Sequence, residues 1–111
     1  MAWIELIDQE QFSNEILKKG EVRHVVFKHS PRCGISSMVL RRFEKTDFFQ
    51  TSKDQLWLID VVKSRDLSTQ IAQNINVRHE SPQVLVFSDG KVIHHDSHSG
   101  IDGDTLISLF K

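Results

Sequence analysis

The chain has little cysteine, and this shortage excludes a protein that is held together by disulfides. Cys33 is the one cysteine among 111 residues, so neither an internal disulfide nor a disulfide framework can form. A solitary reactive thiol survives as a working group in a reduced compartment. We therefore expect a cytoplasmic protein rather than a secreted one.

Charge imbalance and long apolar runs are also missing. The chain carries 14 basic and 15 acidic side chains, with a formal net charge of -1 and no long block of either sign. It lacks the electrostatic footprint of a protein that binds nucleic acid or an anionic membrane surface. No apolar stretch approaches the roughly 20 residues that cross a bilayer. The N-terminus also lacks a basic segment followed by an apolar run. We expect no nucleic-acid and no membrane partner.

The length predicts one domain over residues 1–111, and no repeat, low-complexity tract or Pro/Gly-rich linker divides it. In the first half, the apolar patterns predict a short strand, a capped helix, a buried strand and a longer helix. Their expected ranges are 3–6, about 8–19, 22–28, and 34 to the high forties.

The second half begins with another buried strand, expected over residues 56–62. Because a helix joins it to the strand at 22–28, the two strands should be parallel. Apolar residues at spacings of four then predict a helix that is capped by Ser64 and ends near Asn76.

A hairpin and a helix are expected to close the chain. An Asp-Gly pair lies between the apolar runs 84–87 and 92–95, which is a strong hairpin signal. The amphipathic pattern of Leu106, Ile107 and Phe110 predicts the last helix.

Cys33 lies where a strand stops and a helix begins. The first backbone N–H groups of a helix lack partners and its dipole is positive there, so the thiolate is favoured over the thiol. Lys28 and Arg32 add positive charge nearby. Ser36 occupies the place where a two-cysteine motif carries its second sulfur; it either supports the sulfur by a hydrogen bond or is a helix cap only. The alternative for Cys33 is an inert buried side chain, which its polar neighbours disfavour.

Three separated segments resemble one family. Segment 28–36 reads Lys-His-Ser-Pro-Arg-Cys-Gly-Ile-Ser, segment 79–83 reads His-Glu-Ser-Pro-Gln, and Ser-His follows the hairpin at 97–98. In this order and spacing they resemble the YtxJ or bacilliredoxin family of monothiol thioredoxin-like proteins. The resemblance implies an α/β, thioredoxin-like fold, with a central mixed β-sheet of four to five strands flanked by helices. Gly34 departs from the family's usual proline and resembles the Cys-Gly-Phe-Ser of cluster-carrying monothiol glutaredoxins.

The residues and the resemblance together predict the site. We expect Cys33 and Ser36 to be catalytic, and the substrate to be bound by Lys28, Arg32, Gly34, Ser81 and Pro82. In the resembled fold the proline equivalent to Pro82 is cis and faces the sulfur, and the backbone of the preceding residue, here Ser81, pairs with a thiol-bearing substrate. The alternative is a trans proline at a strand entry. His79 and Gln83 either line the groove or occupy solvated edge positions.

A histidine cluster follows the predicted hairpin turn. Imidazole and carboxylate are common ligands of zinc and iron, and strand alternation places His94, Asp96 and His98 on one face and His95 on the other. Polar residues on an exposed hairpin strand are the simpler explanation. We therefore predict no metal site.

These features predict a monothiol thiol-disulfide oxidoreductase that removes a low-molecular-weight thiol from mixed disulfides on client proteins. Cys33 is expected to attack the sulfur of the small thiol and hold it as a mixed disulfide until external reduction. The resemblance implies that this thiol is bacillithiol, a co-substrate rather than a tightly bound cofactor. Two other functions stay open. One is an iron-sulfur carrier in which two chains and two small thiols share a cluster, although no Gly-Gly-Xaa-Asp motif follows the hairpin. The other is a non-catalytic redox sensor.

Overall fold

A five-stranded mixed β-sheet forms the centre of the protein in a computed structural model that describes residues 3–109. The strand order is β1-β3-β2-β4-β5. Strand β2 pairs in parallel with β3 and antiparallel with β4, while β1 is parallel to β3 and β5 antiparallel to β4. The strands are β1 (Ile4–Glu5), β2 (Arg23–His29), β3 (Gln55–Asp60), β4 (Gln83–Ser88) and β5 (Lys91–Ser97). The expected mixed sheet and the parallel pairing of the two buried strands are confirmed.

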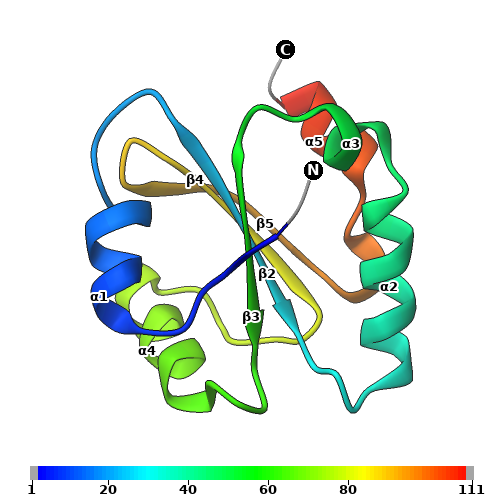
Figure 1. The fold of residues 1–111 in the computed structure, drawn as a ribbon, viewed down its shortest axis with the longest axis horizontal. Coiled ribbons are helices and arrows are strands. Elements are labelled where there is room, and N and C mark those ends of the chain that lie inside the picture. The colour runs from blue at the N-terminus through cyan, green and yellow to red at the C-terminus, as the bar shows by residue number, and fades with distance from the viewer. Residues whose placement is uncertain (1–2, 110–111) are drawn as a thin grey trace.

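Helices cover both faces of the sheet, as Figure 1 shows. One face carries α1 (Gln9–Gln11), which continues as a π-helical segment (Phe12–Ile16), together with α4 (Arg65–Ile75). The other face carries α2 (Gly34–Glu44), α3 (Asp47–Thr51) and α5 (Gly103–Leu109). A short 3-10 helix (His98–Gly100) connects β5 to α5. No helix of the described chain combines the length and apolar character that a membrane crossing needs.

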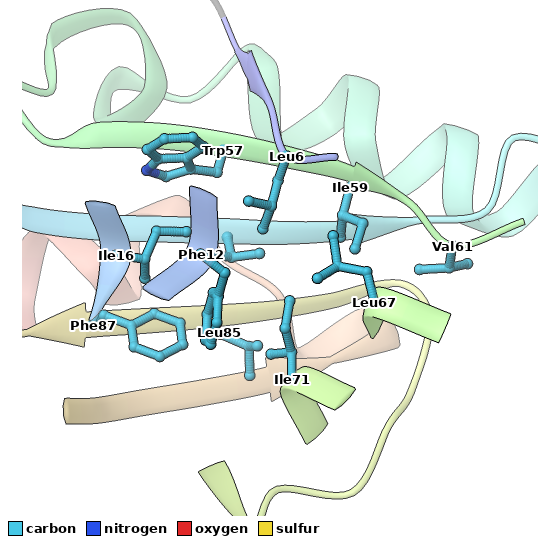
Figure 2. Packing of buried hydrophobic residues seen from close by; sticks show 11 residues of the cluster. Leu6, Phe12, Ile16, Trp57, Ile59, Val61, Leu67, Ile71, Leu85 and Phe87 are labelled. Atoms are coloured by element: carbon cyan, nitrogen blue, oxygen red, sulfur yellow. The ribbon is translucent and has the colours of Figure 1, made fainter. Parts of the chain in front are cut away.

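The core has two apolar clusters, one on each face of the sheet. Consecutive residues of β2 supply both, because successive side chains in a strand point to opposite faces. Val26 belongs to the cluster beneath α1 and α4, and Val25 and Phe27 belong to the cluster beneath α2, α3 and α5. All three are fully buried, as expected for a buried strand. Figure 2 shows the first cluster, in which Phe12 and Phe87 meet edge to face.

Two helix predictions are wrong in extent. The first helix begins as predicted, because Asp8 accepts a hydrogen bond from the Gln11 N–H at 2.7 Å. It ends at Ile16 rather than near residue 19. The helix after Cys33 is in fact two helices, because Thr46 adopts an extended backbone and its hydroxyl caps α3 by accepting from the Phe49 N–H.

The remaining boundaries differ by a few residues. Strand β3 ends at Asp60, since the Asp60 carboxylate accepts from the N–H groups of Val62 and Lys63 and turns the chain. Ser64 occupies the N-cap position of α4 without a side-chain cap hydrogen bond, and Asn76 ends the helix in a left-handed conformation.

The hairpin and the last helix are confirmed. Asp89 and Gly90 both have positive φ angles, 53° and 78°, which is the backbone of a two-residue hairpin turn that matches the twist of the strands. The last helix is α5, in which Leu106 is buried. Phe110, which we assigned to that helix, lies outside the described residues.

Candidate functional site

Cys33 stands at the start of a helix, as predicted. It is the N-cap residue of α2, with an extended backbone (φ -106°, ψ 119°) and a half-buried side chain. Its N–H donates to the Ser30 carbonyl, and its own carbonyl accepts the Ser37 N–H, both at 3.1 Å. The amides of residues 34–36 thus begin the helix, before the first intrahelical hydrogen bond, and the thiol lies at the positive end of the α2 dipole.

Ser36 is fully buried and its hydroxyl holds the loop before the helix. Its Oγ accepts a hydrogen bond from the Ser30 N–H at 3.0 Å and pairs with His29 Nδ1 at 2.8 Å. The hydrogen bonds of the Ser36 hydroxyl are with the loop rather than with the sulfur, and a catalytic role of Ser36 stays a prediction. Ser36 positions the Cys33 loop. Burial lowers the pKa of His29, and this effect exceeds the opposite effect of the Asp60 and Glu44 carboxylates, which raise it.

A cavity of about 460 Å³ opens at Cys33. It lies where β2 and β3 end, at the lower edge of the sheet in Figure 1, because parallel strands end at the same edge. A hydrogen bond of 3.0 Å from the Val61 N–H to the His29 carbonyl ties the two strand ends together. The lining residues come from the Cys33 loop, the β3–α4 turn and the segment before β4: Ser30, Arg32, Cys33, Val61, Val62, Arg65, His79 and Ser81.

The charge on the cavity wall is positive. Arg32 and Arg65 both line it, and no aspartate or glutamate of the described residues does. Within residues 3–109, neither guanidinium has a carboxylate at salt-bridge distance. The two cationic groups are therefore able to attract an anionic ligand.

The segment before β4 brings a proline to this region. The Ser81–Pro82 peptide bond is cis, Ser81 lines the cavity, and Pro82 is buried. The Pro82 carbonyl accepts the His98 N–H at 2.9 Å, which fixes this segment to the end of β5. Gln83 is buried and donates to the Arg78 carbonyl at 2.9 Å, so it does not line a groove, whereas His79 does line the cavity.

Lys28 and Gly34 lie outside the cavity wall. Lys28 is fully buried and its ammonium contacts the Ser68 carbonyl at 3.2 Å and His79 Nδ1 at 3.3 Å. The predicted substrate contact by Lys28 is therefore corrected, because its charge reaches the cavity only through His79. Burial lowers the pKa of Lys28 to about 8. Gly34 is exposed at the first position of α2, and a β-carbon added there would meet no other atom within 4 Å.

Sequence reasoning missed Arg65 and the two valines after β3. The predicted topology could have indicated these residues. The carboxyl ends of adjacent parallel strands lie at the same edge of a sheet, so the turn after the second buried strand lies at the same edge as Cys33. The missed contact between Lys28 and His79 has no such signal, since 51 positions separate the two residues.

The histidine cluster does not assemble as strand alternation implied. His94 Nε2 lies 3.6 Å from the Asp96 carboxylate, but His98 belongs to the 3-10 helix after β5 and has a φ of 53°. Alternation stops with the strand, so His98 does not continue that face. Among residues 3–109, no three His, Cys, Asp or Glu side chains are grouped for a metal ion.

Comparison with known proteins agrees with this geometry. Residues 4–106 match the family model described as monothiol bacilliredoxin BrxC. A solved structure described as an oxidoreductase with a thioredoxin fold is 30% identical, with a TM-score of 0.84 over 97% of this chain and 93% of the other. Thioredoxins from Malassezia sympodialis (22% identity, TM-score 0.69) and Trypanosoma brucei brucei (18%, 0.76) share the fold. The matches cover 97% and 98% of this chain, and 87% and 91% of theirs.

Proposed function

Because this chain belongs to the monothiol bacilliredoxin family, we propose that it removes bacillithiol from mixed disulfides on client proteins. The observation that carries the proposal is the position of its one cysteine, half-buried at the N-terminus of α2 and open to a cavity of small-molecule size. A thiol in that position lies at the positive end of a helix dipole and where a small disulfide can reach it.

The reaction is one thiol-disulfide exchange. The Cys33 thiolate forms a bond to the bacillithiol sulfur, the bond between that sulfur and the client sulfur breaks, and the electron pair leaves on the client thiolate. The client is reduced and Cys33 is oxidised to a mixed disulfide with bacillithiol. A second low-molecular-weight thiol, attacking the bacillithiol sulfur, restores Cys33. An external thiol is required because position 36 carries a serine.

The charges around Cys33 favour attack at the small thiol rather than at the client. Arg32 and Arg65 line the cavity and attract the carboxylates of an anionic thiol, while Ser81 supplies its backbone for strand-like pairing. The carboxylate-bearing half of the mixed disulfide is thereby drawn toward Arg32 and Arg65, while only the sulfur of the client enters the cavity. We further propose that the reaction takes place in the cytoplasm, where a lone thiol stays reduced.

Intact-mass spectrometry tests both the reaction and its direction. Reduced protein is mixed with a client protein carrying bacillithiol, and the chain is expected to gain one bacillithiol on Cys33 while the client loses it. The Cys33→Ser variant should leave the client modified. A disulfide between Cys33 and the client would show attack at the wrong sulfur, and no transfer by the intact chain would refute the function.

A further inference from the structure

A buried ammonium lies directly behind the cavity of Cys33. Lys28, from β2, is fully buried, and its Nζ contacts the Ser68 carbonyl of α4 at 3.2 Å. Its other polar contact is with Nδ1 of His79, at 3.3 Å. Ser68 Oγ lies 3.0 Å from the same ring nitrogen. His79 thus has its Nδ1 edge against buried groups, while the residue itself is exposed and lines the cavity with Cys33.

The donors around Nδ1 decide where the imidazole proton sits. An ammonium can only donate, so Nδ1 must accept from Lys28, and the proton of the neutral ring is then on Nε2. The Ser68 hydroxyl can donate to the same lone-pair region. The opposite tautomer would place an N–H against the ammonium of Lys28. Contacts at Nδ1 therefore select the tautomer whose free edge carries a proton.

We propose that His79 is a catalytic residue that donates its Nε2 proton to the thiolate leaving from the substrate at Cys33, and that buried Lys28 is a positioning residue that fixes its tautomer. This inference rests on the proposed exchange reaction and adds a proton source to it. It assigns a role to an unusual feature of the core, a lysine without a carboxylate partner among the described residues.

The proton balance of the step is complete. As the Cys33 thiolate bonds to the small-thiol sulfur, the leaving client sulfur takes the proton from His79 Nε2, and Lys28 passes one proton to Nδ1. This leaves Lys28 neutral and the ring proton on Nδ1. After the product leaves, Nε2 on the exposed side of the ring takes a proton from solvent and Nδ1 returns its proton to Lys28, which restores both groups. Burial lowers the pKa of Lys28 to about 8, so the lysine holds this proton less tightly than an exposed lysine.

The charged groups around His79 support a neutral ring. Its pKa is lowered by burial first, then by Lys28 and by Arg65 of α4, while Glu80 on the same segment raises it. Arg32, from the Cys33 loop, adds positive charge to the cavity that the ring lines. A ring that is neutral at pH 7 has a single proton, and the contacts at Nδ1 determine its place.

Nitrogen NMR of the histidine rings tests the tautomer without any substrate. The His79 signals, assigned by their loss in His79→Gln, are expected to show a protonated Nε2 and an unprotonated Nδ1 at pH 7. In Lys28→Met the His79 pKa should rise and the tautomers should mix, while Ser68→Ala should keep the Nε2 tautomer because Lys28 remains. An Nδ1–H tautomer in the wild type, or an unchanged ring in Lys28→Met, would overturn the assignment to Lys28.

Leaving groups of different basicity test the proton donation. For a bacillithiolated peptide, whose leaving thiol is alkyl, His79→Leu should slow transfer to Cys33 by about 100-fold, the lower end for a positioned proton donor. Lys28→Met should slow it by about tenfold. With 4,4′-dithiodipyridine, whose leaving group needs no proton at sulfur, both variants should be slowed far less than with the bacillithiolated peptide. His79→Gln keeps a hydrogen-bond donor but no proton that it can transfer, so it should stay as slow as His79→Leu.

The outcomes separate this inference from the proposed function. Suppose that the wild type transfers bacillithiol and that His79→Leu is as fast as the wild type with each of the two disulfides. Proton donation by His79 is then refuted and the proposed function stands. If the wild type accepts no bacillithiol, the function is refuted, and the NMR tautomer still decides the contact between Lys28 and His79. Equal slowing of His79→Leu with both disulfides would mean that the ring only shapes the cavity, which also refutes proton donation.

Discussion

The two sides of the Cys33 cavity are held by different kinds of buried polar group. On the Cys33 side, residues 29–36, a neutral serine hydroxyl ties the loop to the helix through neighbours in sequence. On the His79 side, a buried ammonium from β2 joins α4 and the segment before β4, across 40 and 51 positions. The first arrangement is local and uncharged. The second is long-range and charged.

This difference has an energetic consequence. A neutral hydroxyl with its partners satisfied costs little to bury, whereas an ammonium must be taken out of water. The Cys33 side therefore stabilises the fold and the His79 side is expected to weaken it. A destabilising group retained beside a reactive thiol is consistent with a chemical role.

Replacing Lys28 by methionine should produce the largest effect. Burial lowers the Lys28 pKa from 10.5 to about 8, and each unit is about 1.4 kcal/mol, so the buried charge costs the fold about 3 kcal/mol at pH 7. Lost contacts to Ser68 and His79 offset part of this. Lys28→Met should therefore raise the free energy of unfolding at pH 7 by about 2 kcal/mol, as measured by urea unfolding.

The pH dependence of the free energy of unfolding identifies the cause of the gain in Lys28→Met. Between about pH 8 and pH 10.5 the unfolded lysine binds a proton that the folded one has lost, so the stability of the wild type rises with pH through this window. The advantage of Lys28→Met should shrink in the same window and vanish by its upper end. An advantage that is constant with pH would show that the methionine improves packing and that no buried charge was removed.

Replacing Ser36 by alanine should have the next largest effect, with the opposite sign. The change leaves the half-buried Ser30 N–H and His29 Nδ1 without this hydroxyl partner, and the free energy of unfolding should fall by about 1 kcal/mol. The half-buried neighbour Ser37 is the matched control, and Ser37→Ala should change stability by less than about 0.5 kcal/mol. Equal losses in the two variants would contradict a specific role of Ser36 in holding the loop.

Reversing the charge of Arg65 tests the positive wall of the cavity. Arg65→Glu should slow transfer from a bacillithiolated peptide by about tenfold at low salt, and by less at high salt, because the guanidinium attracts carboxylates by screened electrostatics. Arg41→Glu makes the same charge change on an exposed part of α2 outside the cavity wall. If both variants slow transfer alike, only the net charge matters and Arg65 has no specific role.

The contrast between the two sides also shows what the sequence could predict. The order of strands and helices, the hairpin and the helix start at Cys33 follow from patterns within a few residues, and all are confirmed. The break at Thr46 was missed because a local cap interrupted one continuous apolar pattern. The burial of Lys28 could not be predicted. A lysine near the end of a strand has the same sequence neighbours whether its side chain is exposed to solvent or covered by α4.

The smallest effect is expected at Gly34, and it measures how much a single helix-start amide contributes to thiol reactivity. A β-carbon at Gly34 would meet nothing within 4 Å, and the residue is the first of α2, where proline is tolerated. The backbone of Cys33, at φ -106° and ψ 119°, already suits a residue before proline. Gly34→Ala and Gly34→Pro should therefore each raise the free energy of unfolding by about 0.4 to 1 kcal/mol, since both restrict the unfolded chain.

The two variants differ in one group, the N–H of residue 34. Alanine keeps it and proline removes it, so the alkylation rate of Cys33 against pH should be unchanged in Gly34→Ala and should shift in Gly34→Pro if that amide stabilises the thiolate. If the alkylation profiles of the two variants are identical, the N–H of residue 34 does not stabilise the thiolate. The other amides of the helix start and the cationic cavity wall are then responsible. Because the two variants are expected to be equally stable, the comparison isolates electrostatics at the sulfur from the packing of the loop that carries it.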